Sequence, residues 1–420
     1  MNERIFKNLT LILLFLSNLL FFKFYSAMKM QKICSPSSKV SRLLACVIAA
    51  TSAIWVSCNR NSEVQISAAD DAHNGLSSIT ILTWDEYFSM DLIRDFEREH
   101  KVNVDFVHFT NVDEMEELMR SRPSDFDLVL TTNGKVADLI ATQLVQPIEK
   151  DRIPLASNLD KRFLDLGSDP GNRFSVPYMW GPTLIAYRSD KIADPAKSWA
   201  SLWDDRYKGH VLLLDEPFDT YAAALMTLGY DINTQDSDEL EKASQRLTQH
   251  VRDFDSRFVD IFEVRDRLLS GDCWITMTYS SDAAVLAEKE PNISYFVPEE
   301  GASLWLDCFV VPREAKNPEM AHAFLDFFCR PDVAAANSSE LWCASANREA
   351  RALVSQEVLE DPTIYLSEEV LARCQFERQS SPSRQMAVNQ GFKRIFDEIR
   401  QAEASKQRAV AMPAESIAEP

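Results

Sequence analysis

Short apolar runs alternate with amphipathic stretches along the middle of the chain. Runs of strand length occupy Ile79–Trp84, Val102–Phe109 and Phe126–Leu130. Between them, Met90–His100 and the segment 112–120 carry apolar side chains at helical spacing, and Asn111 is placed to cap the second helix. This β-α-β-α-β order predicts a parallel sheet with right-handed crossovers, and such sheets bind ligands beyond the carboxyl ends of their strands.

The same pattern returns in the second half of the chain. After a Pro- and Gly-marked stretch at 176–182, the apolar runs predict strands at Leu184–Tyr187, Val211–Leu214, Trp274–Thr278 and Ala302–Pro312. Helices are predicted at Tyr221–Leu228, from Ala283 with Asp282 as its cap, and at Pro318–Cys329. Residues 403–420 are rich in Ala, Glu and Ser, and we expect a disordered tail there.

The length and charge of the chain narrow the possible functions. Its 420 residues leave room for two domains, and its net charge is -20 at pH 7. An acidic chain lacks the basic surface that nucleic acid binding needs, so we expect no nucleic acid partner. The acidity suits a cationic ligand, although strong negative charge also serves solubility.

The N-terminal region carries two apolar stretches that follow basic residues. Leu9–Phe22 is short for a membrane span, and a true start at Met28 or Met30 would exclude it. The second stretch, Leu43–Val56, has the order of a secretory signal peptide. We therefore assign residues 1–57 to a signal peptide.

Cys58 follows a small residue at the end of this signal, in the run Trp55-Val56-Ser57-Cys58. This arrangement resembles a bacterial lipoprotein processing site, although Trp55 stands where Leu is usual. We expect Cys58 to be lipidated and 58–77 to be a polar linker behind the lipid anchor. Ordinary signal cleavage nearby and an uncleaved anchor are the alternatives.

The cysteines and histidines form no metal motif. Five cysteines follow Cys58, and their spacings fit no known ligand set. The six histidines are scattered. We predict no metal, no cofactor and no particular disulfide.

Aromatic residues and carboxylates recur together where several predicted strands end. Trp305 and Asp307 lie two apart in a predicted strand and therefore face the same side. Alone, this pair is better explained by a core Trp beside an Asp that caps the next loop. The further combinations are Trp84 with Asp85 and Tyr87, Glu216 with Asp219, and Tyr279 with Asp282. An aromatic face beside a carboxylate suits an organic cation, and no Lys or Arg interrupts these turns.

Seven stretches resemble the periplasmic spermidine/putrescine-binding proteins of polyamine ABC transporters, in the same order and at the same spacing. They are TWDEYF at 83–88, DFDLVLTT at 125–132, SVPYMWGPTLIAY at 175–187, SWASLWDDRYKGHVLLLDE at 198–216, GDCWITMTYSSDA at 271–283, EEGASLWLDCFVVPREAKNPE at 299–319 and FLDFFCRPDVA at 324–334. The resemblance covers roughly 79 to 400.

The resemblance implies an α/β fold, the two-lobed type II periplasmic-binding-protein fold. Each lobe would be a mostly parallel sheet flanked by helices, and crossing hinge strands would join the lobes. Residues 78–182 would begin the first lobe, 183–306 the second, and 307–402 would return to complete both.

The resemblance also implies a ligand-binding set in the cleft between the lobes. The positions that match are Trp84, Asp85, Tyr87, Thr131, Glu216, Asp219, Ser256, Tyr279, Trp305, Asp307 and Glu377, with Ser256 and Glu377 aligned only loosely. Several of them depart from the family pattern. Tyr279 replaces a Trp, Asp85 replaces a small polar residue, and the acids at 216 and 219 are exchanged. Asn133 stands where an aromatic is frequent, and Glu377 where a neutral amide is usual.

The implied function is the capture of spermidine or putrescine and its delivery to permease subunits in the inner membrane, by a monomer anchored in the periplasm. A same-fold receptor for another cationic or small solute, or a surface lipoprotein that has diverged from transport, remain alternatives. An enzyme is not expected, because Cys308 would face away from Asp307 and no His has a motif that places it nearby.

Overall fold

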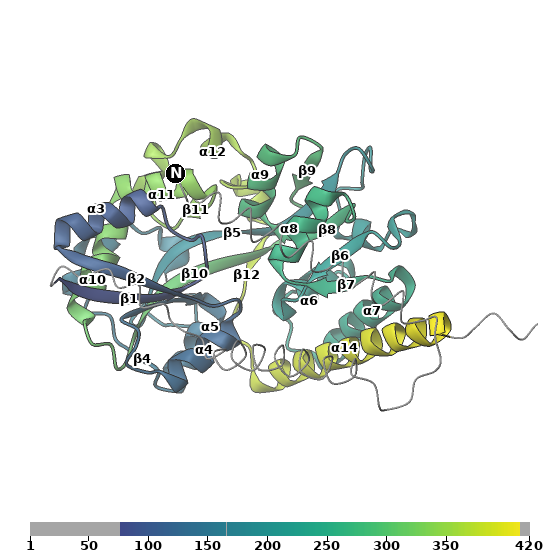
Figure 1. Ribbon diagram of the computed structural model, residues 1–420, viewed down its shortest axis with the longest axis horizontal. Helices are drawn as coiled ribbons and strands as arrows, with labels where there is room; N and C mark the ends of the chain where they lie inside the picture. Colours follow the sequence, from purple (N-terminus) through teal and green to yellow (C-terminus); the bar gives the residue numbers. More distant parts are fainter. Residues whose placement is uncertain (1–75, 165, 412–420) are drawn as a thin grey trace, which may run out of the picture. The chain divides into compact units, whose positions relative to one another are not determined.

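The computed structural model describes residues 76–164 and 166–411. Its strands are β1 (Ser77–Thr83), β2 (Val102–His108), β3 (Leu128–Thr132), β4 (Val145–Gln146), β5 (Ser175–Arg188), β6 (Val211–Leu214), β7 (Arg257–Val259), β8 (Ile275–Tyr279), β9 (Ile293–Phe296), β10 (Ser303–Pro312), β11 (Ala344–Ser345) and β12 (Gln375–Phe376). Its α-helices are α3 (Met90–His100), α4 (Val112–Ser121), α5 (Asn133–Ala141), α6 (Pro217–Thr227), α7 (Ser237–Phe254), α8 (Ile261–Ser270), α9 (Ser280–Lys289), α10 (Pro318–Phe328), α11 (Pro331–Leu341), α12 (Gln356–Glu360), α13 (Glu368–Leu371) and α14 (Pro382–Ala411) (Figure 1).

The first β-α-β units form as the apolar pattern predicts. β1 pairs in parallel with β2 on one side and with β3 on the other. The Asn111 side chain accepts a hydrogen bond from the Glu114 backbone N–H, which confirms the predicted cap of α4. β10 closes this sheet in the antiparallel sense, with Asp307 opposite Thr132.

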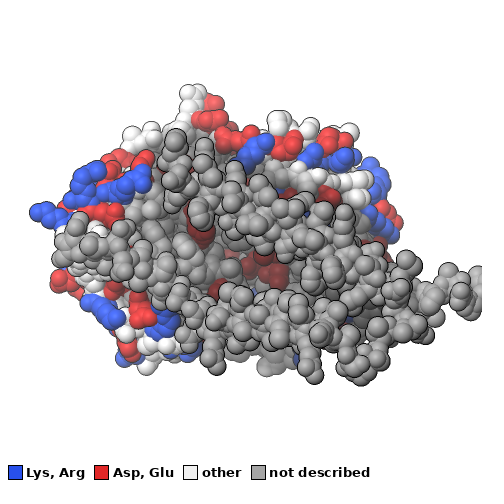
Figure 2. All heavy atoms as spheres, in the orientation of Figure 1, with Lys and Arg blue, Asp and Glu red and all other residues white. Residues whose placement is uncertain are grey.

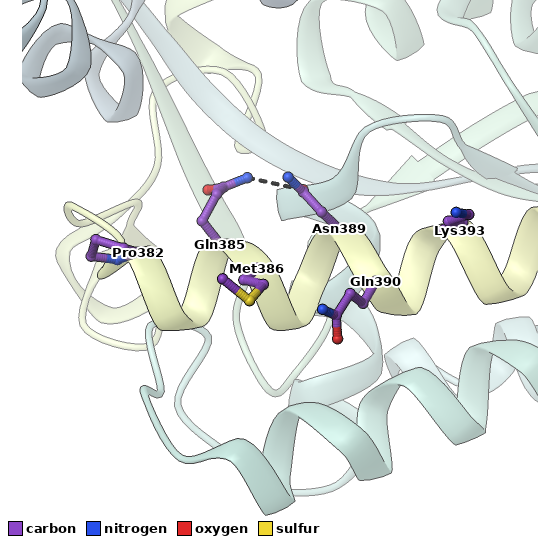
Figure 3. A pocket seen from close by; sticks show the side chains of 6 residues that line it. All are labelled: Pro382, Gln385, Met386, Asn389, Gln390 and Lys393. Atoms are coloured by element: carbon purple, nitrogen blue, oxygen red, sulfur yellow. Dashed lines mark hydrogen bonds between the residues drawn. The ribbon is translucent and has the colours of Figure 1, made fainter.

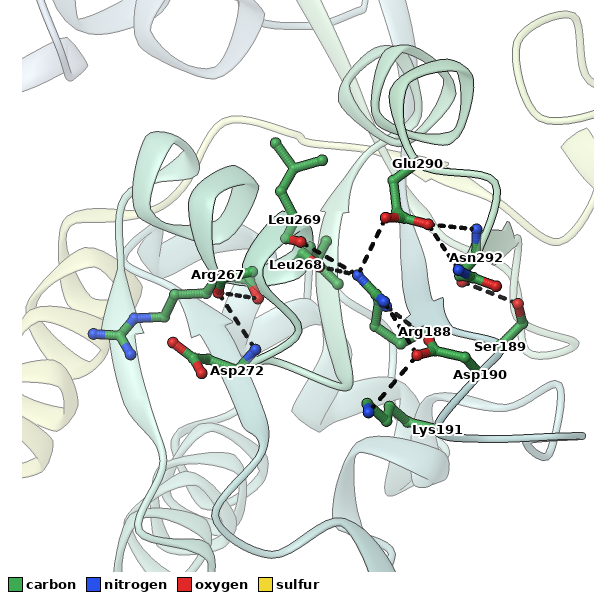
Figure 4. A network of polar contacts seen from close by, with 11 residues as sticks. Arg188, Ser189, Asp190, Lys191, Arg267, Leu268, Leu269, Asp272, Glu290 and Asn292 are labelled. Carbon is green, nitrogen blue, oxygen red and sulfur yellow. Dashed lines mark hydrogen bonds and ion pairs between the residues drawn. The ribbon is translucent and has the colours of Figure 1, made fainter.

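A second sheet region repeats the parallel arrangement. β6 lies between β7 and β8 and is parallel to both, while β5 runs antiparallel to β8 and β9. Arg188 anchors the end of β5. Its guanidinium binds the Asp190 carboxylate and donates to the carbonyls of Leu268 and Leu269 at the end of α8 (Figure 4). The last carbonyls of a helix lack full partners within it, and although Gly271 N–H also donates to the Leu268 carbonyl, Arg188 binds both carbonyls and ties the strand to the helix.

β5 differs from its sequence prediction. The stretch at 176–182 was expected to interrupt the strand before Leu184, but β5 is one strand of 14 residues. Its pairing with β10 is irregular: Leu306 lies opposite Trp180, whereas Cys308 lies opposite Pro177. The extra residue therefore lies in β5, which bulges next to a proline that cannot donate to the ladder.

The buried apolar side chains of the described residues form two separate hydrophobic cores. The first contains Ile81, Trp180 and Phe309, and the second contains Leu184 and Phe392. We call the elements around the first core the first lobe and those around the second the second lobe. This arrangement is the two-lobed type II periplasmic-binding-protein fold expected from the sequence.

The chain passes between the lobes three times. β5 leaves the first core at Trp180 and enters the second at Leu184. β10 returns from the second lobe to the first, where it pairs with β3. The segment after β12 then leads to α14, whose Val388, Phe392 and Ile395 belong to the second core, beside α7 (Figure 1).

Two further expectations are corrected. Asp282 does not cap α9: the helix begins at Ser280, and Asp282 lies inside its first turn. The disordered tail was predicted from residue 403, but α14 continues to Ala411. Residues 412–420, the signal peptide at 1–57 and Cys58 lie outside the described residues. None of the described helices is long and apolar enough to cross a membrane.

Candidate functional site

Predicted site residues from both lobes meet where the strands of the two sheets end. Trp84 follows β1, Asn133 follows β3, and Glu216 follows β6. Tyr279 is the last residue of β8, and β10 carries Trp305 and Asp307 between the two lobes. In a space-filling view, Asp and Glu side chains are visible in a recess near the middle of one face (Figure 2).

Asp307 and Tyr87 form one end of the site. Asp307 is 6% exposed, and its carboxylate accepts a hydrogen bond from the Tyr87 hydroxyl. Trp84 packs beside Tyr87 with ring centroids 5.7 Å apart. Burial raises the pKa of the Asp307 carboxyl to about 7, and the Asp219 carboxylate contributes to the increase. A buried carboxylate with a single neutral donor favours the approach of a cation.

Two aromatic rings form the middle of the site. Tyr279 and Trp305 meet edge to face with centroids 6.1 Å apart. Trp305 lies directly on Gly181, where an added Cβ would come within 2.6 Å of the Trp305 ring atom Cζ2 and 2.8 Å of the Ser280 hydroxyl. A side chain at position 181 would therefore displace the indole. Within the described residues the buried Trp305 Nε1 has no hydrogen-bond partner.

Three carboxylates form the far end of the site: Glu216, Asp219 and Glu377. Asp219 is held by two hydroxyl groups, because its Oδ1 accepts from Thr183 Oγ1 and Ser303 Oγ, each at 2.7 Å. Glu216 occupies the N-cap position of α6 but makes no capping hydrogen bond. The explanation of this acid as a helix cap therefore fails.

Glu377 belongs to the third crossing between the lobes. Its carboxylate lies against Gly134 at the start of α5, where an added Cβ would be 2.2 Å from Glu377 Oε2. Asn133 donates to the Glu377 carbonyl at 3.2 Å and accepts from Ser168 Oγ at 2.6 Å. Asn233 of the second lobe donates to the Phe376 carbonyl at 2.9 Å. Side chains from both lobes thus fix the backbone that carries Glu377.

The far carboxylates hold their protons strongly. Burial raises the pKa of the Glu216 carboxyl to about 8, with further contributions from Asp219 and Glu377. Burial likewise raises the pKa of the Glu377 carboxyl to about 7, and it raises the pKa of Asp219. Among the described residues, no Lys or Arg forms an ion pair with Glu216, Asp219, Asp307 or Glu377. Four acids therefore face the site without a direct ion pair, although the nearby charges of Arg384 and Lys135 oppose the increase in the pKa of Glu377.

Acids from both ends of the site affect the Tyr279 hydroxyl. Burial raises the pKa of its hydroxyl, and the charges of Glu216, Asp219, Asp282 and Asp307 raise it further. One hydroxyl thus lies within electrostatic reach of acids from both ends. Acids of both ends therefore act on Tyr279, whose ring packs against that of Trp305.

Asp282 has a different role from these four acids. It is 7% exposed and pairs with Arg265, whose Nη2 lies 2.5 Å from its Oδ1. Arg265 Nη1 also lies 3.4 Å from Glu86 Oε2. Glu86 belongs to the first lobe and Arg265 to the second, so this ion pair links the lobes. Glu86 was recognised in the sequence as one of the carboxylates beside Trp84 and Tyr87 but not as a partner of an arginine, and nothing in the sequence pointed to Arg265.

Three of the predicted positions are not brought into this arrangement. Ser256 is buried in the second lobe, with its hydroxyl 2.6 Å from His250 Nδ1. It precedes β7, whereas the site residues follow strand ends, so its assignment to the cleft is wrong. Asp85 is exposed, accepts from the Glu86 backbone N–H at 2.9 Å and lies 3.8 Å from His108.

Thr131 is fully buried, and the strand pairing places it opposite Cys308 rather than Asp307. Directly opposite residues share a face of the sheet, so Thr132 is the residue on the Asp307 face. The Thr131 hydroxyl has no partner within the described residues. The contacts of Thr131 and Asp85 with a ligand stay predictions.

A hollow on α14 has no part in this site. It is lined by Pro382, Gln385, Met386, Asn389, Gln390 and Lys393, and it contains no acid and none of the predicted residues (Figure 3). Elsewhere in the described part of the chain, no three His, Cys, Asp or Glu side chains converge as metal ligands would.

Two lobes with acidic and aromatic side chains gathered at their strand ends are typical of a solute-binding protein of the periplasmic type. The model of the bacterial extracellular solute-binding protein family matches residues 91–364. The chain belongs to this family.

Named relatives agree with this classification. A putrescine-binding periplasmic protein of Escherichia coli strain K12 is 30% identical over 315 residues, which cover 70% of this chain and 85% of the relative. A spermidine/putrescine-binding periplasmic protein of the same strain is 31% identical over 301 residues, with the same coverage. The solved structure of a spermidine/putrescine ABC transporter substrate-binding protein from Streptococcus pneumoniae superposes with a TM-score of 0.69 at 25% identity, and the match covers 77% of this chain and 99% of that one. These relatives are named as binding proteins of transporters and not as enzymes.

Proposed function

We propose that this protein captures polyamines, spermidine or putrescine, in the cleft between its lobes and delivers them to an ABC permease. The observation that carries the proposal is the set of four acids around the rings of Tyr279 and Trp305 that form no ion pair with a Lys or Arg of the described residues: Glu216, Asp219, Asp307 and Glu377. A polyamine supplies ammonium groups for the carboxylates and methylene groups for the rings. The named relatives bind the same class of solute.

The contacts in the cleft are sufficient for useful affinity. Charge-assisted hydrogen bonds contribute roughly 1.5–3 kcal/mol each, and a desolvated cation–π contact contributes about 2 kcal/mol. Micromolar binding requires about 8.2 kcal/mol. Three or four such contacts exceed that figure and leave a margin for the entropy lost when a flexible amine is ordered.

Transport follows from closure of the two lobes around the ligand. A hinge motion at the crossing strands would exclude water and present a closed surface to the permease. Acylation of Cys58 would keep the receptor at the membrane surface, and the linker at 58–77 would let it reach the permease.

A thermal-shift panel of polyamines, amino acids, sugars and metal ions tests the proposal. The melting temperature of the full-length protein should rise with polyamines and stay constant with the other three classes. A rise with a sugar or a metal ion and none with any polyamine would assign the fold to another solute. No rise with any compound would favour a surface lipoprotein that has diverged from transport.

A further inference from the structure

The two ends of the cleft differ in the number of acids that remain free for a ligand. At the near end, Asp282 already has Arg265 as its counter-ion, which leaves Asp307. At the far end, Glu216, Asp219 and Glu377 form no ion pair with any described residue. The cleft therefore offers one free acid at one end and three at the other.

Strand β10 gives a measure of the distance between these ends. Ser303 binds Asp219 of the far end, and Asp307 itself forms the near end. The bulge lies in β5, so β10 stays regular, and Ser303, Trp305 and Asp307 project from the same face. Four residues of strand span about 13 Å. Glu377 lies at the far end as well, because it directly follows Phe376, which pairs with Leu304.

The length of the ligand follows from this separation. The acids at the two ends are about 13 Å apart along the strand. An ammonium group that lies between them, about 2.8 Å from its acid, shortens this distance at each end. The two ammonium nitrogens are therefore roughly 7 to 13 Å apart. With bonds of about 1.5 Å, an extended four-carbon diamine spans ~6 Å between its nitrogens, whereas a triamine with three- and four-carbon links spans ~11 Å. The triamine falls inside this range, whereas the four-carbon diamine is shorter than its lower limit.

The charges of the acids also favour the triamine over the four-carbon diamine. A diamine bound at one end leaves the acids of the other end without a cation, so these acids either carry an unfavourable buried charge or keep their protons and add no charge-assisted hydrogen bond. A triamine supplies one ammonium to Asp307 and two to the region of Asp219, Glu216 and Glu377, with its methylene links beside Trp305 and Tyr279.

We propose that the cleft selects a linear triamine over the four-carbon diamine, with Asp307 binding one terminal ammonium and Glu377, with Glu216, binding the other. This inference rests on the proposed function and specifies its substrate. Glu377 is the specificity-determining residue, because the hydrogen bonds of Asn133 and Asn233 hold its backbone at the far end of the cleft.

Isothermal titration of the full-length protein separates length from charge. Three ligands are compared at one ionic strength: the four-carbon diamine, the eight-carbon diamine and the triamine of the same length as the latter. We expect the triamine to bind at least tenfold more tightly than the four-carbon diamine, about 1.4 kcal/mol, with the eight-carbon diamine between them. Equal or tighter binding of the four-carbon diamine would overturn the inference while leaving the proposed function intact. If no amine binds, both fail.

Substitution of the far acid tests the assignment of Glu377. Glu377→Gln keeps the shape of the side chain and removes its charge, and Glu369→Gln at an exposed position of α13 is the matched control. We expect Glu377→Gln to weaken triamine binding about tenfold and diamine binding less than threefold. An equal loss for both ligands, or no loss for the triamine, would overturn the role of this acid in selecting length.

Discussion

Replacement of Asp307 by Asn should weaken ligand binding and stabilise the unliganded protein at the same time. Asn keeps the shape of the side chain and an oxygen that accepts from the Tyr87 hydroxyl. The substitution removes only the negative charge. Because Asp307 is 6% exposed and has no cationic partner, this charge is unfavourable in the empty protein and useful only with a cation present.

The pKa of Asp307 gives the size and sign of the stability effect. An increase from 3.8 to about 7 on folding corresponds to roughly 4 kcal/mol against the ionised form. The folded state binds this proton more strongly than the unfolded state does. The contribution of this proton to the free energy of unfolding is therefore fully present below pH 3.8, and it is lost as the pH rises through about 7. Asn does not titrate, so its stabilising effect should grow across this range and level off above it.

The effect on binding is of opposite sign. Loss of one charge-assisted hydrogen bond, roughly 1.5–3 kcal/mol, lowers affinity by about 10- to 150-fold. Calorimetric titration with spermidine gives the affinity, and thermal unfolding at a series of pH values gives the stability. Asp272→Asn is the matched control, because Asp272 is exposed and precedes β8, whereas the site residues follow strand ends. Unchanged affinity, or a melting temperature lowered at every pH, would refute the reasoning.

Three further outcomes are expected. Polyamine binding should weaken as salt concentration rises, because several ion pairs form in the complex; an affinity that does not depend on salt, measured by titration calorimetry, would count against a carboxylate-lined cleft. Gly181→Ala should reduce affinity at least tenfold, about 1.4 kcal/mol, by displacing Trp305, and a crystal structure with the indole unmoved would disprove this cause. Mass spectrometry of the mature protein should find an acylated Cys58, whereas an unmodified residue downstream of it as the N-terminus would exclude the lipid anchor.

Much of the fold was predictable because each local signal agreed with its surroundings. The limits of α3 and β6 match the apolar pattern residue for residue, and Asn111 caps α4 as expected. β5 was less predictable because Pro177, Gly181 and Pro182 are typical of loops. The strand tolerates them because a bulge lies beside Pro177 and because Gly181 makes room for Trp305.

The site was predictable where chemistry and strand position coincide, as in Trp305 and Asp307. It was not predictable where tertiary contacts decide the role of a side chain. Asp282 has the residue type of a helix cap or a ligand, yet Arg265 from another helix neutralises it. Ser256 is a polar residue that aligns only loosely with a ligand position of the family, and His250 holds it in the core. Sequence spacing does not show which partner lies across a helix or a lobe.

The three chain crossings have a mechanical consequence. Two separate connections define an axis about which the lobes can bend. The third connection restricts the lobes further to bending about this axis. Twisting or shearing of the lobes would break the hydrogen bonds between β5 and β10. Glu377 belongs to the third of these crossings: Asn133 of one lobe binds its carbonyl, and Asn233 of the other lobe binds the carbonyl of Phe376. In the proposed closure of the lobes, this acid should therefore be displaced little. An ammonium group bound to Glu377 would therefore stay in place while the two lobes separate around it. The ligand would then be released in a fixed order, from the Asp307 end first and from the Glu377 end last.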